Sequence, residues 1–162
     1  MRRAALAILA GQALYAAAFR VMLRRTAAKL MAGDVDAFLR FYAKDAVLHF
    51  PGENSWGPEY RGHDEIRGFL ERFLAVGLQG ELHEIVVNGP PWKTDVVVHF
   101  TDDAHAPDGA RVYENDALVH LKVRWGKVVE ERVYEDTEKV AAFDRYLESR
   151  EPEAEAAPAA VA

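Results

Sequence analysis

The chain has 162 residues, of which 50% are hydrophobic and 28% charged, a composition typical of one globular domain. It contains no cysteine, which excludes disulfides, thiolate chemistry and cysteine-ligated metal sites. Its formal net charge is −6, whereas nucleic-acid-binding proteins usually present a basic surface that displaces counterions from phosphate. The composition therefore argues against a nucleic-acid partner.

The N-terminal segment is predicted to form one long helix. An alanine-rich apolar run follows Arg2 and Arg3 and continues to Phe19, and alanine is the strongest helix former. Arg20 ends the run at about sixteen residues, fewer than the ~20 that span a bilayer. We assign residues 1–19 as an apolar helical extension that packs on the domain or on a partner in the cytoplasm. Membrane association and a cleaved signal peptide are the alternatives.

A short strand between two helices is predicted next. Gly33 ends the first helix, and Asp34 caps a second helix over residues 35–46 (VDAFLRFYAKDA). A strand over Ala46–Phe50 follows, and the segment ENSWGPEYRG is predicted to be a loop.

A third helix and a series of strands make up the remainder. The helix begins at His63 and Asp64 and carries an apolar stripe of Ile66, Phe69, Leu70 and Phe73. Strands are predicted over Glu81–Val87, Thr94–Thr101, Arg111–Arg124 and Lys127–Glu135, with DDAHAPDG as a polar turn between the second and the third. A final helix follows Asp136, and residues 150–162 are predicted to be disordered.

This order predicts an α+β fold in which a curved antiparallel sheet wraps around three helices, with an extended N-terminal helix and a C-terminal helix. We assign this cone-shaped domain to residues 20–149. A sheet wrapped around helices leaves a cavity at its mouth, which is a natural place for a small-molecule site.

Three separated segments resemble the SnoaL-like polyketide cyclase and ketosteroid isomerase families of the nuclear-transport-factor-two-like superfamily. They are AGDVDAFLRFYAKDAVLHFPG, YRGHDEIRGFLERF and RVYENDALVHLKVRWGKVVEERVYEDTEKV, in that order, and the likeness extends over Lys29–Leu147. The resemblance implies a cone with a ligand pocket at its open end. It leaves the activity open, because this fold hosts enzymes, binding modules and proteins without known activity.

The resemblance also implies which familiar mechanisms are absent. The base, the tyrosine and the protonated aspartic acid of ketosteroid isomerases correspond to Phe50, Thr26 and Val119, and neither Phe50 nor Val119 can transfer a proton. One aspartate of the related limonene epoxide hydrolases corresponds to Val133. The catalytic sets of both families are therefore incomplete in this chain.

Glu131 is the candidate catalytic residue. Side chains alternate faces along a strand, so if Val119 faces the cone, Glu131, Val133 and Glu135 face it too. A carboxylate in an apolar cavity has a raised pKa, which suits a general acid or base. The alternative is a structural ion pair between Glu131 and Arg24 or Arg25.

Other side chains are expected to line or close the pocket. Asn115 would either donate a hydrogen bond to a ligand carbonyl or hold a neighbouring loop, and Trp56 and Tyr60 would gate the cavity or seal it. His49 is a further candidate, although strand alternation points it outward. The remaining predicted lining residues are Tyr113, Phe50, Phe69, Phe73, Val119, Val133 and Glu135. The histidine spacings match no metal-binding motif, and we expect neither a metal nor another cofactor.

The sequence thus predicts a protein that binds a small hydrophobic molecule. If it is an enzyme, the expected activity is cofactor-independent and isomerase-like, cyclase-like or hydrolase-like, with acid–base chemistry on a hydrophobic carbonyl or polyketide-like compound. The alternative is a non-catalytic ligand-binding or dimerisation module. In that case the exposed sheet face, with Leu118, His120 and Tyr134, would form a homodimer interface, and the N-terminal helix would reach a partner or a membrane.

Overall fold

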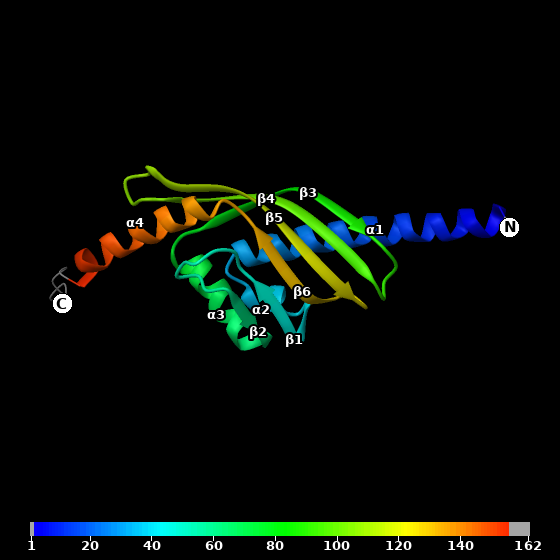
Figure 1. Ribbon diagram of the computed structural model, residues 1–162. Helices are drawn as coiled ribbons and strands as arrows, with labels where there is room; N and C mark the ends of the chain where they lie inside the picture. Colours follow the sequence, from blue (N-terminus) through cyan, green and yellow to red (C-terminus); the bar gives the residue numbers. More distant parts are fainter. Residues whose placement is uncertain (1, 156–162) are drawn as a thin grey trace.

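A computed structural model describes the backbone of residues 2–155 and the side chains of residues 10–150. Within this range the helices are α1 (Arg2–Met31), α2 (Val35–Leu39), α3 (Gly62–Ala75) and α4 (Thr137–Glu155). The strands are β1 (Tyr42–His49), β2 (Glu59–Arg61), β3 (Gln79–Asn88), β4 (Thr94–His105), β5 (Arg111–Arg124) and β6 (Lys127–Tyr134). Figure 1 shows a curved sheet that wraps around the inner part of α1, while α1 and α4 extend from opposite ends of the molecule. The predicted α+β cone is confirmed.

The six strands form one sheet in the order β2-β1-β6-β5-β4-β3. All neighbouring pairs are antiparallel except β1 and β6, which run parallel, so the prediction of a purely antiparallel sheet is wrong at this pair. A parallel pair requires a long crossover, and the whole chain from β2 to β5 separates these two strands. At the β5–β6 hairpin, Trp125 and Gly126 both have positive φ, 52° and 78°, as in the two-residue turns that match sheet twist.

The helix predicted over residues 35–46 is much shorter in the structure. Asp34 does cap it, because the Asp34 carboxylate accepts a hydrogen bond of 2.9 Å from the Ala37 amide. The helix nevertheless ends at Leu39 and β1 begins at Tyr42, four residues before the predicted strand. The Val128 amide donates to the Phe41 carbonyl at 2.7 Å, so pairing with β6 overrides the local helical pattern.

Strand β4 is also longer than predicted. It continues to His105, and the segment Asp102–His105 is therefore strand rather than turn. Asp102 pairs with Asn115 and Ala104 pairs with Tyr113 on β5. Asp102 and Ala104 are buried, so the alternation of β4 carries a carboxylate onto the inner face of the sheet. The predicted loop before α3 likewise contains the short strand β2.

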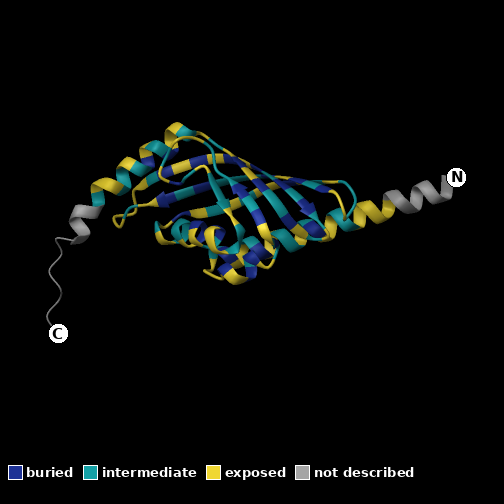
Figure 2. Cartoon of the chain, turned by 60° about the horizontal axis from the view of Figure 1, so that its bottom comes forward, coloured by how far each residue is buried: buried dark blue, intermediate teal, exposed yellow. Residues whose placement is uncertain are grey.

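The predicted faces of β5 and β6 are confirmed. Tyr113, Asn115, Ala117, Val119, Leu121 and Val123 are buried on β5, and Glu131 and Val133 are buried on β6. Leu118, Arg132 and Tyr134 on the opposite face are exposed. Figure 2 shows this alternation along the strands.

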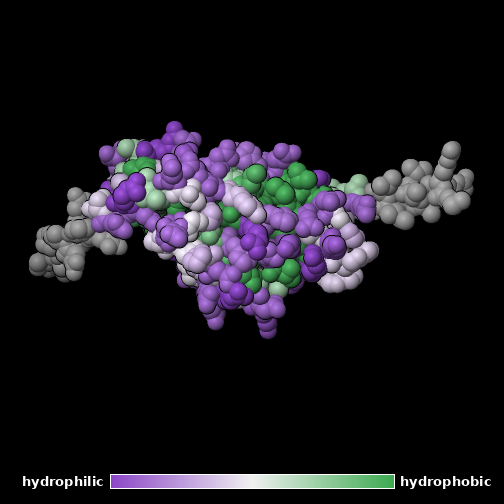
Figure 3. Space-filling model, viewed as in Figure 1, coloured by the Kyte–Doolittle hydropathy of each residue, from purple (hydrophilic) through white to green (hydrophobic). Residues whose placement is uncertain are grey.

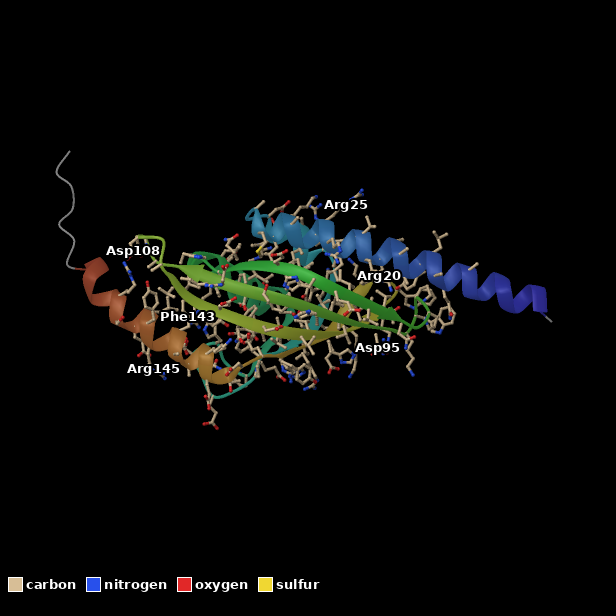
Figure 4. The ribbon with its side chains drawn as sticks, turned by 90° about the horizontal axis from the view of Figure 1, so that it is seen from above. Arg20, Arg25, Asp95, Asp108, Phe143 and Arg145 are labelled. Carbon is tan, nitrogen blue, oxygen red and sulfur yellow. The ribbon has the colours of Figure 1, made fainter. Side chains whose placement is uncertain are left out.

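Helix α1 is continuous, as predicted, and its second half is attached to the edge strand β3. The Arg20 guanidinium donates to the Ile85 carbonyl at 2.8 Å. Arg24 donates to the Leu82 and His83 carbonyls at 3.0 and 2.7 Å. Arg25 points away from the sheet in Figure 4. The two arginines satisfy carbonyl groups that an edge strand would otherwise leave unpaired.

Two predictions concern the ends of the chain, the N-terminal helix and the C-terminal tail. Among the residues that the structure describes, no helix is long and apolar enough to cross a membrane. Helix α4 continues to Glu155, and the rest of the predicted disordered tail, residues 156–162, lies outside the described residues.

The attachment of α1 to β3 can be tested by comparing two neighbouring arginines. Arg24→Ala removes two hydrogen bonds to the edge strand and should lower the free energy of unfolding by about 1–2 kcal/mol. Arg25→Ala removes an exposed guanidinium from the same helix turn and should change it by less than about 0.5 kcal/mol. Urea unfolding of both variants measures the difference, and equal losses would contradict the role given to Arg24.

Candidate functional site

The inner face of the sheet and the helices enclose a cavity of about 160 Å³. Its walls come from α1, α3, the long strands and the start of α4, and they are mostly aliphatic and aromatic. An engineered apolar cavity of ~150 Å³ in another protein binds benzene. The cavity is therefore large enough for a ligand about the size of one six-membered ring.

One wall of the cavity is a cluster of aromatic rings. The ring centroids of Phe50, Trp56 and Phe69 lie 5.6–6.2 Å from one another. The Arg72 guanidinium covers the Trp56 ring at 4.1 Å from its centroid. Trp56 is 2% exposed, and its indole Nε1 donates no hydrogen bond to any described residue. A buried indole N–H without a partner is unusual, and this one belongs to a cavity-lining side chain.

The Glu131 carboxyl and the Tyr42 hydroxyl form a buried hydrogen-bonded pair in the same cavity. The Tyr42 hydroxyl donates a hydrogen bond to Glu131 Oε2, and the two side chains are 5% and 9% exposed. Burial raises the pKa of Glu131 to about 7, while the hydrogen bond from Tyr42 acts in the opposite direction. Among the described residues, no arginine or lysine forms an ion pair with Glu131, and Arg24 is engaged with β3. Both protonation states of Glu131 are thus accessible near neutral pH.

Asp102 and Glu135 form a second acidic group that lines the cavity. Burial raises the pKa of Asp102 to about 7. Burial, together with the charge of Asp102, raises the pKa of Glu135 to about 8. Asp102 Oδ1 and Glu135 Oε1 are buried and accept no hydrogen bond from any described residue. Sequence reasoning missed Asp102 because DDAHAPDG resembles a turn, although the alternation of Val96, Val98 and Phe100 continues to it.

Most of the residues predicted to line the pocket do lie in the cavity wall. They are Glu131, Tyr113, Phe50, Trp56, Phe69, Phe73, Val119, Val133 and Glu135. Thr26 also lines the cavity, but its hydroxyl donates to the Met22 carbonyl at 2.9 Å.

Three predicted residues lie elsewhere. Asn115 is 1% exposed but lies outside the cavity wall, and its amide donates to Tyr113 Oη and the Asp136 carbonyl at 3.1 and 3.0 Å. It therefore holds the junction between β6 and α4. Tyr60 is not among the residues that line the cavity, and its hydroxyl donates a hydrogen bond to the Trp56 carbonyl, so it supports Trp56.

His49 is the third predicted residue outside the cavity. Its ring lies 3.1 Å from the Glu59 carboxylate and 3.3 Å from Arg132, on the opposite side of the sheet from the cavity wall. No three His, Asp or Glu side chains among the described residues are grouped so that they could hold a metal ion.

Comparison with known proteins identifies the domain. The family model described as a SnoaL-like domain matches residues 23–131. The chain belongs to the SnoaL-like domain family. No curated protein matches the sequence.

Solved structures share the fold of this SnoaL-like protein. Bal32a, from a soil-derived mobile gene cassette, is 18% identical with a TM-score of 0.69, over 80% of this chain and 98% of that one. TerC co-crystallised with polyporic acid is 22% identical with a TM-score of 0.64, over 80% and 98%. SalBIII, an epoxide hydrolase/cyclase-like enzyme in pyran ring formation in the polyether salinomycin, is 18% identical with a TM-score of 0.60, over 75% and 92%. At these identities the likeness shows the fold alone.

The buried carboxyl groups predict an unusual dependence of stability on pH. A carboxyl whose pKa is raised by folding stabilises the protein fully below its unfolded value, 4.5 for Glu131, and this contribution is lost as the pH rises to about 7. For Glu131 alone the loss is about 3 kcal/mol. The free energy of unfolding should therefore fall between about pH 5 and about pH 8.

Urea unfolding across this range tests the prediction, with Glu131→Gln expected to flatten the curve. Glu130→Gln is the matched control, because Lys122 and Arg132 lower the pKa of Glu130 to about 2, below the range examined. An unchanged slope in Glu131→Gln would show that Glu131 ionises normally.

Proposed function

We propose that this protein binds an apolar carbonyl compound of about one ring and catalyses its isomerisation by proton transfer through Glu131. The observation that carries the proposal is the state of this carboxyl group. It is buried, lines the cavity and is hydrogen-bonded to a phenol instead of a cation. A general base works best when its pKa lies near the operating pH, and the value of about 7 meets that requirement.

The proposed reaction moves one proton within the substrate. The ionised Glu131 removes a proton from the carbon between the carbonyl group and a carbon–carbon double bond, which leaves a dienolate and a neutral carboxylic acid. The acid then returns the proton to the far end of the dienolate, so the double bond becomes conjugated with the carbonyl group. Atoms and electrons balance without a cofactor.

Trp56 is the proposed donor to the substrate oxygen. Its Nε1–H is buried in the cavity wall and has no partner among the described residues, so a ligand carbonyl would satisfy it. The enolate oxygen carries more negative charge than the carbonyl oxygen, and a fixed donor therefore stabilises the transition state more than the ground state. Asn115, which the sequence suggested for this role, already uses its amide within the protein.

Two structural neighbours support a ligand-binding cavity in this fold. TerC was crystallised with polyporic acid, and SalBIII is described as cyclase-like. They do not specify the substrate of this chain, for which the dimensions of its own cavity are the better guide.

The proposal predicts isomerisation of 3-cyclohexen-1-one to 2-cyclohexen-1-one, followed by the ultraviolet absorption of the conjugated product. Glu131→Gln should lower the rate by about 10²–10⁴-fold, because it removes the proton acceptor and keeps the shape of the side chain. Glu130→Gln, on the outer face of the same strand, should retain activity.

The pH dependence of this reaction adds a second readout. The rate should increase with pH and level off above about 7 as Glu131 ionises. Tyr42→Phe removes the hydrogen bond that lowers the pKa of Glu131, so the midpoint of the profile should move to higher pH. Binding of the ketone without turnover by the wild-type protein would favour the non-catalytic alternative.

The outer face of the sheet favours a second role, homodimerisation. Leu118 and Tyr134 are directly opposite each other on β5 and β6, as are Val86 and Val97 on β3 and β4, and all four are exposed. Figure 3 shows hydrophobic surface over the region of β3 to β5. We propose that two copies of the chain pair through this face. Leu118→Glu should shift the mass measured by light scattering from dimer to monomer, and a monomeric wild-type protein would contradict the interface.

We propose that the protein is located in the cytoplasm. The absence of cysteine fits a reducing compartment such as the cytoplasm. Membrane association through residues 1–19 is the alternative, and membrane fractionation of the chain with and without these residues distinguishes the two.

A further inference from the structure

The acidic group at the α4 end of the cavity has no role in the reaction proposed for Glu131. Asp102 is 5% exposed, and Asp102 Oδ1 and Glu135 Oε1 are buried without a hydrogen-bond partner among the described residues. Leaving a buried polar atom unsatisfied costs free energy, and native structures rarely retain one without a reason. Both side chains belong to residues that line the cavity.

The surroundings of the two carboxyl groups supply little positive charge. Asp103 and Asp136 are acidic neighbours and raise the pKa of Asp102 and Glu135, respectively. Lys139 on α4 is exposed and is the weakest of the influences on Asp102. The Asn115 amide reaches Glu135 Oε2 at 3.4 Å, which leaves Oε1 unpaired.

Aromatic rings complete this end of the cavity. Tyr113 and Phe143 stack with centroids 4.6 Å apart, and both line the cavity together with Phe100. Figure 4 shows Phe143 on the side of α4 that faces the sheet. Ring faces attract cations, and the attraction is stronger where water is excluded. Two carboxyl groups among aromatic rings suit an organic cation better than a neutral hydroxyl group.

We propose that Asp102 and Glu135 form a binding site for the ammonium group of a small amine whose apolar part occupies the cavity. The ammonium group would donate hydrogen bonds to Asp102 Oδ1 and Glu135 Oε1 and would offset the repulsion between two ionised carboxylates. This site is distinct from the one proposed for proton transfer, because Glu131 lies within β6 and Glu135 follows its last residue, Tyr134, about 10 Å of strand further on.

Isothermal titration calorimetry with benzylamine tests the site, with benzyl alcohol as the neutral probe of similar shape. At about pH 7, where Asp102 and Glu135 are partly protonated, benzylamine should bind and release protons. The release is measured by comparing buffers of different ionisation enthalpy. Benzyl alcohol should bind at least about tenfold more weakly and without proton release, because it cannot offset the negative charge.

Single substitutions test whether Asp102 and Glu135 bind the ammonium group. Asp102→Asn and Glu135→Gln should each weaken benzylamine binding by about tenfold or more, while Glu130→Gln should leave it unchanged. Glu131→Gln should lose isomerisation and keep benzylamine binding, so failure of one proposal can be told from failure of the other.

Four outcomes would overturn the amine site. They are equal affinities for benzylamine and benzyl alcohol, binding without proton release, undiminished binding in both Asp102→Asn and Glu135→Gln, and no binding of either benzylamine or the smaller propylamine at about pH 8, where Asp102 is mostly ionised and Glu135 about half ionised.

Discussion

The hydrogen bond between Tyr42 and Glu131 joins the two strands on which the architecture of the cone depends. Tyr42 is the first residue of β1, and Glu131 lies in the middle of β6, the parallel neighbour of β1. Without this bond, the buried Glu131 carboxyl would have an oxygen without a hydrogen-bond donor, and the buried Tyr42 hydroxyl would have no acceptor. The bond therefore favours the strand conformation of residues that would otherwise continue α2. It also places an ionisable group in the cavity without a neutralising cation.

The cavity combines apolar walls with two separate acidic groups, and the apolar surroundings determine how readily these carboxyl groups ionise. Burial is the largest influence on Glu131, Asp102 and Glu135, and it favours the neutral form of each. Glu131 then differs from the other two because a phenol hydrogen bond partly supports its ionised form. The charge of Asp102 instead opposes the ionisation of Glu135. One group is suited to exchange a proton with a ligand, and the other is suited to receive a positive charge.

Much of this arrangement follows from the sequence through strand alternation. The apolar set of β5 indicates its inner face, and the hairpin then places Glu131 and Val133 on the same side. Alternation carries no information about which pairs form between distant segments. The helical spacing of its neighbours predicts that Tyr42 belongs to a helix, and only pairing with β6 makes it a strand residue. The hydrogen bonds of Asn115 could not be predicted from the sequence either, because one of its acceptors is the Asp136 carbonyl, next to the start of α4.

The consecutive residues Glu130 and Glu131 show how far one strand position can separate two identical side chains. Glu130 lies on the outer face, where Lys122 and Arg132 donate hydrogen bonds at 2.8 and 2.7 Å and lower its pKa to about 2. Glu131 lies on the inner face, where burial raises its pKa to about 7. The difference arises from the period of the pleat and not from the residue type. A slip of one residue in the pairing of β6 would exchange the two environments, and the cavity would lose the buried carboxyl of Glu131 without any change in sequence.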